Sequence, residues 1–235
     1  MSDIQLPDYK VRTSRKARCA RLSVSPAGQV EIVVPVGFNC SLVPEFLEKH
    51  RQWLEGTLAD IQDRRYQHQG DNDSLPTTIR FLPFGETWTV SCVVSDANRV
   101  TGRQSSLLVK AVDEVAMIKL LRSWLTRNAK NRLGSMLHSV SEEIGLPFRR
   151  VSIRAQKTRW GSCSSRCDIN LNRALMFLPP DIVRYVLIHE LCHTVHLNHS
   201  RAYWSLVKNF YPNYRDVDRA LRYGWCYVPQ WALPK

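Results

Sequence analysis

The chain lacks the marks of a membrane or secreted protein. Its 235 residues hold no run of about 18 apolar residues, the length that a membrane-spanning helix needs. Residues 1–9 have no apolar core of the kind found in signal peptides. The seven cysteines are odd in number and show no paired spacing, which predicts reduced thiols rather than a disulfide framework. We therefore expect a cytoplasmic protein that does not associate with membranes.

Acidic residues are absent from two basic segments. The formal net charge is +12, and residues 10–21 and 149–166 each carry six lysines or arginines and no acid. Positive charge of this density attracts polyanions, so nucleic acid is one candidate partner. The alternative is a basic surface that keeps the protein soluble and has no specific partner.

The first part of the chain is expected to be rich in strands. Residues 21–24 and 30–34 predict a β-hairpin around a turn at 26–28, and residues 78–94 predict a second hairpin around a turn at 83–85. A further strand is expected at 106–112. Between the hairpins, one helix is predicted from 41 to about 62, followed by a polar loop at 67–76. We assign residues 1–112 to a β-rich N-terminal region with one helix.

The second part, residues 113–235, mixes helices with strands. A long helix is predicted over 113–144, with Asp113 as its cap and Gly145 at its end. Alternating apolar residues predict strands at 150–155 and 169–175. A helix is expected from 182 to about 195, and a last helix after Ser200. This order of elements indicates the α+β class.

The most informative motif is the pentapeptide at 189–193, which reads His-Glu-Leu-Cys-His. Its histidines, His189 and His193, are four residues apart and so lie on one face of a helix, where two imidazoles can share one zinc ion. Glu190 is one residue further along and is rotated by about 100° around the helix axis from His189, so it cannot bind the same ion. It can instead reach a metal-bound water and take its proton. The alternative is two histidines that merely occur in a helix. That alternative is disfavoured because the flanking residues are apolar, and burying these groups unpaired costs several kcal/mol.

A catalytic zinc site needs a third protein ligand. No glutamate follows Glu190, which excludes a glutamate from a later helix. His196 is nearly aligned with His189 on the same helix, so three ligands along one axis would diverge. His199 follows a Leu-Asn pair where the chain can turn back, and we rank it first; Asp216 and Asp218 are the remaining candidates.

A second, structural zinc site is the other metal hypothesis. Cys163 and Cys167 could form it together with Cys192 or a histidine. The three-residue spacing is loose and no second cysteine pair follows, so ordinary thiols are the favoured interpretation.

Several motifs together resemble one known family. They are Arg-Trp-Gly-Ser-Cys-Ser-Ser at 159–165, Ile-Asn-Leu-Asn at 169–172, the 189–193 motif, Asn-His-Ser at 198–200 and Trp204. In this combination the chain resembles the YgjP-like metallopeptidases, whose active site is similar to those of the WLM and SprT/Spartan-type proteases.

The resemblance implies a zincin-like catalytic domain at 113–235. It implies zinc ligands at His189, His193 and His199, one Zn²⁺ per chain, and Glu190 as the catalytic base. The strand at 169–175 would be an edge strand that holds an extended peptide. Cys167 departs from the glycine or other small residue expected there. Four further residues are expected to contact substrate: Trp160, Gly161, Asn170 and Tyr203. For the turn at 160–162, the alternative is a structural turn that packs Trp160 on the active-site helix.

Three functions remain in competition. The first is a zinc-dependent peptidase that acts on proteins or peptides. The second is a protease that works on nucleic-acid-bound proteins, which the basic segments and the likeness to Spartan-type enzymes suggest. The third is a zinc-stabilised binding protein without turnover, against which Glu190 argues because a structural site needs no base.

Overall fold

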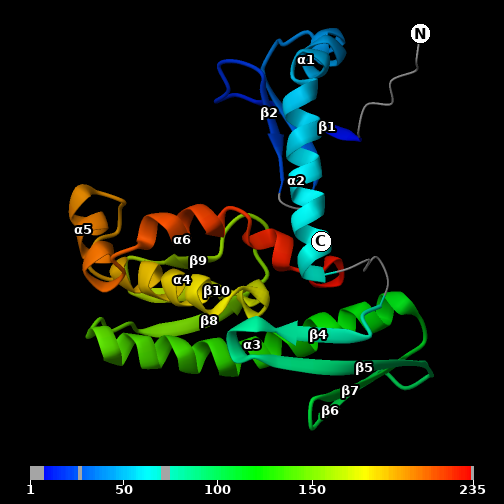
Figure 1. The fold of residues 1–235 in the computed structure, drawn as a ribbon, viewed down its shortest axis with the longest axis vertical. Coiled ribbons are helices and arrows are strands. Elements are labelled where there is room, and N and C mark those ends of the chain that lie inside the picture. The colour runs from blue at the N-terminus through cyan, green and yellow to red at the C-terminus, as the bar shows by residue number, and fades with distance from the viewer. Residues whose placement is uncertain (1–7, 26–27, 70–74, 234–235) are drawn as a thin grey trace. The chain divides into compact units, whose positions relative to one another are not determined.

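The computed structural model describes residues 8–25, 28–69 and 75–233 (Figure 1). The chain forms two compact units, Met1–Gly70 and Asp71–Lys235. The division expected near residue 112 differs from this, because residue 112 lies inside the second unit. In the second unit, the sheet formed by residues 78–111 packs directly against the helix that begins at Glu114. The sheet therefore belongs to the same compact unit as the rest of the chain after it.

The first unit contains one sheet and two helices. The predicted hairpin partners pair antiparallel, and their turn includes residues 26–27, which lie outside the described residues. An unexpected first strand adds parallel to the other side, giving the order β1-β3-β2. The core joins Val30, Ile32 and Val34 to the first helices. The elements are β1 (Tyr9–Ser14), β2 (Arg21–Val24), β3 (Val30–Pro35), α1 (Val43–Lys49) and α2 (Arg51–Gln69).

The single helix expected from residue 41 is interrupted. A 3-10 turn at Cys40–Leu42 precedes α1, and α1 ends at Lys49. His50 leaves the helical region, with φ −108° and ψ 12°, and its backbone N–H bonds to the carbonyl of Leu47. At His50 the backbone hydrogen bond reaches back three residues instead of four, and this 3-10 pattern separates α1 from α2.

The second unit begins with a four-stranded sheet of order β4-β5-β7-β6. The expected hairpin is present, closed by Gly85 in the left-handed region at φ 61°. Strand β6 was not expected from the sequence; it pairs antiparallel with β7, while β5 and β7 run parallel. The strands are β4 (Thr78–Phe81), β5 (Glu86–Val94), β6 (Arg99–Arg103) and β7 (Ser106–Ala111).

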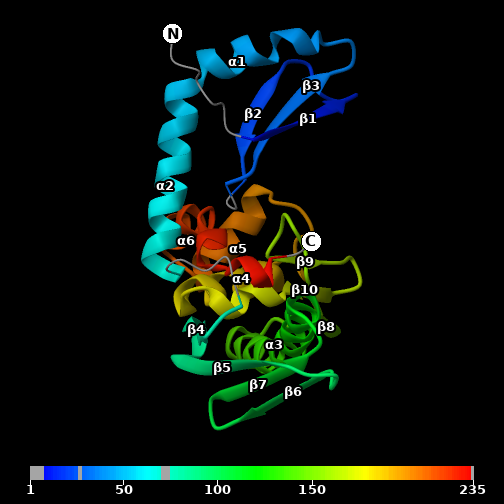
Figure 2. The same cartoon turned by 90° about the vertical axis from the view of Figure 1, so that its right-hand side faces the viewer.

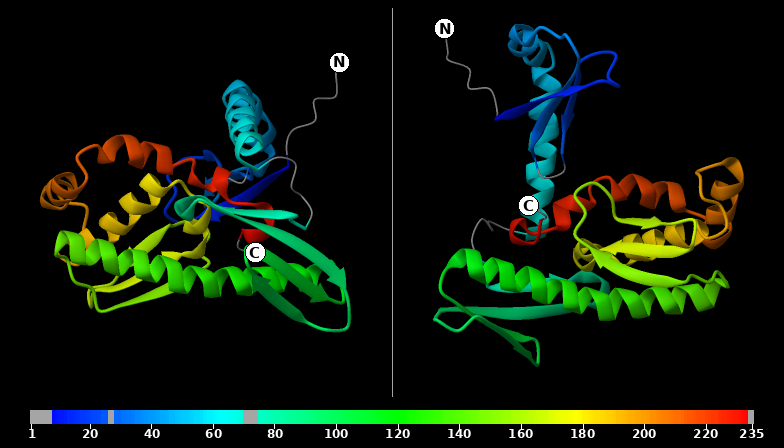
Figure 3. Two further views of the ribbon diagram at one scale, coloured as in Figure 1. Left: turned by 60° about the horizontal axis from the view of Figure 1, so that its bottom comes forward. Right: turned by 180° about the vertical axis from the view of Figure 1, so that it is seen from behind.

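The long helix α3 (Glu114–Ile144) connects the two sheets of this unit, as the views in Figure 3 show. Asp113 caps it by accepting from the Ala116 N–H at 2.7 Å, and Gly145 closes it at φ 68°, both as predicted. Near its start, Trp124 packs edge-on against Trp88 of β5. Further along, the space beside Gly134 is filled by Val151.

The second sheet has the order β8-β10-β9, with β10 parallel to β8 and antiparallel to β9. The strand expected at the edge, 169–175, is therefore the central strand, bonded on both sides. It also ends at Asn172, whose side chain accepts from the Ala174 N–H and starts a 3-10 helix at Arg173–Phe177. The strands are β8 (Arg150–Arg154), β9 (Gly161–Cys163) and β10 (Asp168–Asn172).

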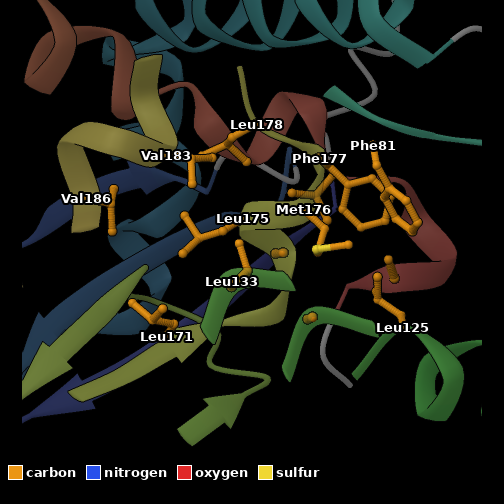
Figure 4. Packing of buried hydrophobic residues seen from close by; sticks show 14 of the residues in the cluster. Phe81, Leu125, Leu133, Leu171, Leu175, Met176, Phe177, Leu178, Val183 and Val186 are labelled. Atoms are coloured by element: carbon orange, nitrogen blue, oxygen red, sulfur yellow. The ribbon is translucent and has the colours of Figure 1, made fainter. Parts of the chain in front are cut away.

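Helices complete the unit and bury its core. Leu171 of β10, Leu175 and Phe177 of the 3-10 turn, Val183 of the next helix and Leu133 of α3 meet in one apolar cluster (Figure 4). Among the described residues, no helix combines the length and the apolar character needed to cross a membrane. The α+β class is as predicted. The helices are α4 (Pro180–Cys192), α5 (Arg201–Phe210) and α6 (Tyr214–Leu221), followed by 3-10 turns at Gly224–Tyr227 and Gln230–Ala232.

Candidate metal centre

Helix α4 carries the central motif into the interior. It starts with Pro180 in its first turn and packs against α3, α5, α6 and β9 (Figure 2). His189 and Glu190 lie in its last turn, and His193 is the residue that caps it. The helix ends three residues earlier than expected, so the motif sits at its C-terminal end. A cation is favoured there because the helix dipole places partial negative charge at that end.

Three imidazoles converge at this point. The ring centroids are 5.0 Å apart for His189 and His193, 4.7 Å for His193 and His199, and 5.1 Å for His189 and His199. One ligand nitrogen from each ring lies within 4.8 Å of the others. The Nε2 atoms of His189 and His199 are 3.2 Å apart. Two nitrogens at a tetrahedral zinc are about 3.3 Å apart, so the arrangement fits that ion.

A tight turn brings His199 back to the helix. The N–H groups of Thr194 and His196 bond to carbonyls of α4, at Leu191 and Cys192. The Nδ1 of His193 lies 2.9 Å from the carbonyl of His196, so it can donate there and leave Nε2 for a metal. His196 thus contributes its backbone and not its ring to the cluster, in line with its rejection as a ligand.

The two aspartates that remained candidates are used elsewhere. Asp218 accepts a hydrogen bond from the Tyr185 hydroxyl at 2.8 Å. Asp216 lies 3.9 Å from Arg219 in an exposed ion pair. Within the described residues, the three histidines form the one group of three or more potential ligands.

Tyr203 lies against the imidazoles instead of facing solvent. Ser200 caps α5 by accepting from the Tyr203 N–H, and the side chain of Tyr203 is completely buried. Its ring stacks on His193 at 4.4 Å, and its hydroxyl donates to the carbonyl of His189 at 3.1 Å. The hydroxyl expected to contact substrate is therefore held by the backbone of α4. This position suits a residue that fixes the orientation of the ligands.

Burial sets the protonation state of His189. Burial, followed by the nearby His193 and His199, lowers the pKa of His189 to about 3. The ring is therefore neutral near pH 7, with a lone pair available to a metal. Its Nδ1 is buried and finds no hydrogen-bond partner among the described residues.

Glu190 is almost completely buried in the centre. It is 5% exposed, and burial raises its pKa to about 8, against a smaller lowering by Arg159. Its Oε2 is buried and has no partner among the described residues. A buried acceptor of this kind is costly unless something occupies the space in front of it. The carboxyl group is thus free of structural hydrogen bonds at that oxygen.

Gly161 of β9 makes room for this carboxylate. A Cβ at residue 161 would lie 2.5 Å from Oε1 of Glu190 and 2.7 Å from its Cδ. Only glycine permits this approach. The close contact made at Gly161 is with Glu190, and contact of Gly161 with a substrate stays a prediction.

The other two expected substrate residues have structural neighbours. Trp160 stacks on Trp225 at 4.3 Å, and a Cβ at Gly224 would collide with its ring. Asn170, on the central strand, lies 3.4 Å from both Ser162 and Arg154. Their contact with a substrate stays a prediction.

The cysteines form no second cluster of three ligands among the described residues. Cys167 adopts the left-handed conformation at φ 58°, which explains why a glycine was expected there. Burial, together with nearby Cys167, Glu190 and Asp168, raises the pKa of the Cys163 thiol to about 12. This thiol is protonated near pH 7, which disfavours metal binding.

Two further residues support the site, and the sequence named them only as members of the family motifs. Asn172 is 1% exposed, and its amide donates to the carbonyls of Gln156 and Arg159, holding the loop that leads into β9. Trp204 lies beside the ligands, 5.4 Å from His199 and 6.0 Å from His189. Both belong to motifs that carry the family resemblance, but no sequence pattern assigned a supporting role to either residue.

A buried helix that presents two histidines and a glutamate, with a third histidine returning from a turn, is the arrangement of a metallopeptidase. Comparison with protein families supports this class: residues 18–223 match the YgjP-like metallopeptidase domain. The chain belongs to the YgjP-like family. Its fold is consistent with a zincin-like domain.

Two solved structures are similar to part of the chain, and both are metallopeptidase zymogens. Abylysin of Pyrococcus abyssi is 24% identical, with a TM-score of 0.35 over 38% of this chain and 90% of its own. Jannalysin of Methanocaldococcus jannaschii is 14% identical, with a TM-score of 0.34 over 38% of this chain and 92% of its own. A search of curated proteins gave no match.

Proposed function

We propose that the protein is a zinc-dependent peptidase with one ion per chain, held by His189, His193 and His199, and with Glu190 as general base. The observation that carries this proposal is the convergence of three ligand nitrogens within 4.8 Å beside a buried glutamate. Membership of the metallopeptidase family supports peptide bonds as the target. Three imidazoles favour zinc or a late transition metal over magnesium or calcium.

When bound, zinc supplies Lewis acidity toward water and toward the carbonyl of the scissile bond. Glu190 accepts the proton of the attacking water and returns it to the leaving amine. One carboxyl group within reach of the water can carry this proton through both steps. The buried, unpartnered Oε2 leaves the base available, and Gly161 leaves it space.

Substrate binding is proposed along β9 instead of β10. Strand β10 is bonded on both sides, whereas β9 is bonded to β10 alone among the described strands. An extended peptide added to the outer edge of β9 would run past Gly161 and therefore past Glu190. Backbone hydrogen bonding of this kind accepts many sequences, so side-chain preference must come from elsewhere.

The test is a comparison of the wild type with Glu190→Gln. The variant keeps the shape of the side chain and loses the base, so hydrolysis of an unfolded protein substrate should fall by about 10²- to 10⁴-fold. Zinc content, measured by mass spectrometry, should remain one per chain. The matched variant His199→Ala should lose both zinc and activity. Equal cleavage by the wild type and Glu190→Gln, with zinc in both, contradicts the proposal.

A second candidate is a peptidase that acts while bound to nucleic acid. The specific observation is β1 with the segment after it, where Lys10, Arg15, Lys16 and Arg18 are exposed. Arg12 in the same strand pairs with Glu31, which removes one charge from the set. Binding of a labelled DNA should weaken steeply as salt rises. If no DNA binds at low salt, the nucleic-acid candidate fails and the peptidase proposal is unaffected.

The non-catalytic alternative is the weakest of the three. A purely structural zinc site closes with a fourth protein ligand. The described residues place three potential ligands together, and a base that no structural role requires lies next to them.

A further inference from the structure

A second feature lies next to the metal centre, in a hollow between α5 and α6. Both helices pack on α4 (Figure 1). The hollow has a volume of about 520 Å³. Four arginines line it, with two aromatic residues and one aspartate; the arginines are Arg201, Arg215, Arg219 and Arg222. All four are exposed, so their guanidinium groups remain hydrated.

The charge of this arginine pocket is strongly positive. Asp218 is its one acidic lining residue, and it already accepts the hydrogen bond of Tyr185. Asp216 reaches Arg219 from outside the pocket at 3.9 Å, in a pair that is more than 70% exposed on each side. Such a pair is weak and can exchange for another anion. Arg215 lies against the ring of Tyr214.

The arginine pocket shares a wall with the metal centre. Trp204 lines the pocket, and its ring lies 5.4 Å from His199. On the pocket side, the same ring stacks on Tyr214 at 5.2 Å with an angle of 16° between the planes. The pocket therefore begins one aromatic ring away from the ligands. The two ring-to-ring steps, 5.4 Å from His199 to Trp204 and 5.2 Å from Trp204 to Tyr214, together correspond to at most roughly three residues of extended chain.

We propose that this pocket is a subsite for an acidic side chain of the substrate, an aspartate or glutamate within about three residues of the scissile bond. The inference rests on the proposed peptidase function. Backbone hydrogen bonding along β9 cannot distinguish one side chain from another, and this pocket would supply that selectivity. Guanidinium groups bind carboxylates through paired N–H donors, so four of them around one hollow favour an anion.

A peptide fits this pocket better than a nucleic acid strand does. Proteins that bind single strands offer a long groove and free aromatic faces on which bases stack. Here Trp204 and Tyr214 stack on each other, which covers one face of each ring, and Arg215 lies over the ring of Tyr214. Asp218 in the wall would also oppose a chain of phosphates, whereas a single carboxylate can sit away from it.

The experiment compares the zinc-loaded wild type with the double variant Arg219→Glu/Arg222→Glu. A control variant, Arg127→Glu/Lys130→Glu, makes the same change of net charge on exposed residues of α3. Each protein digests a mixture of peptides from a whole proteome, and the residues around the cut bonds are counted. A fluorescent peptide with glutamates, and its glutamine counterpart, are also titrated against Glu190→Gln versions of all three, which reports binding without turnover.

The wild type and the control should cut near Asp or Glu and bind the glutamate peptide about five- to tenfold more tightly than the glutamine peptide. This preference should shrink as salt rises. The double variant should lose the preference and keep its cleavage of neutral peptides. An unchanged preference in the double variant, or an equal loss in the control, overturns the subsite.

The remaining outcomes separate the subsite from the peptidase function. Cleavage of neutral peptides with no acidic preference overturns the subsite and leaves the peptidase. If no zinc-loaded protein cleaves any peptide, the peptidase fails, and the binding arm still decides whether the pocket selects glutamate. A labelled single-stranded oligonucleotide is titrated against the same three Glu190→Gln proteins. Loss of its binding in the double variant alone, with peptide binding unchanged, would replace the acidic peptide by a nucleic acid.

Discussion

Replacing Gly161 by alanine is the sharpest test of how the base is positioned. The added Cβ would lie 2.5 Å from Oε1 and 2.7 Å from Cδ of Glu190. Ordinary contact between such atoms is about 3.5 Å, so the carboxyl group must retreat by roughly 1 Å. Because Glu190 is 5% exposed, it cannot swing into open solvent without disturbing its neighbours.

The retreat should act on turnover more than on binding. A displacement of about 1 Å at a catalytic group can cost on the order of 10² in rate, so kcat should fall about a hundredfold while KM changes little. Packing one methyl group into a filled space should also lower the free energy of unfolding by about 1–3 kcal/mol. Zinc should remain bound, because the three histidines are not touched by the change.

The assay measures kcat and KM on a fluorogenic peptide, together with zinc content and urea unfolding. Gly134→Ala is the matched control, since its Cβ would meet Val151 at 3.8 Å, an ordinary contact, inside α3. That variant should keep full activity and gain up to about 1 kcal/mol of stability. A Gly161→Ala enzyme with kcat within about threefold of wild type would refute the positioning argument.

Three further predictions test the supports of the site and the fold. Tyr203→Phe removes the hydrogen bond to the carbonyl of His189 and should cost about 1 kcal/mol in urea unfolding; an unchanged midpoint would speak against it. Arg132 donates to Glu86 and lowers the pKa of that carboxyl below its usual 4.5. The pair is partly exposed, so the wild type should exceed Glu86→Gln by about 0.5–1 kcal/mol above about pH 4.5, and this advantage should vanish as pH falls through the lowered pKa. Equal melting-temperature differences at pH 7 and pH 3 would show that the charge is irrelevant. Chelation should lower the melting temperature of the wild type and leave that of His199→Ala unchanged; a fall in both would place the ion elsewhere.

The sequence predicted those structural features that depend on residues close together in the chain, such as helix caps. Asp113 and Gly145 mark the ends of α3 because a cap and a left-handed glycine act within one turn of helix. The spacing of His189 and His193 placed two imidazoles together for the same reason. The break at His50 and the early end of α4 were missed, since helix ends depend on a few bonds that composition does not specify.

The sequence by itself determined that this chain is an α+β protein with a histidine–glutamate helix, because periodicity, caps and i, i+4 spacing are properties of neighbouring residues. Tertiary structure alone decided that β10 is central and β9 is an edge strand, since pairing brings together strands separated by a loop. It also decided that Gly161 faces Glu190, and that arginines from two helices surround one hollow beside Trp204. These contacts join residues far apart in the chain, and no short-range pattern records them.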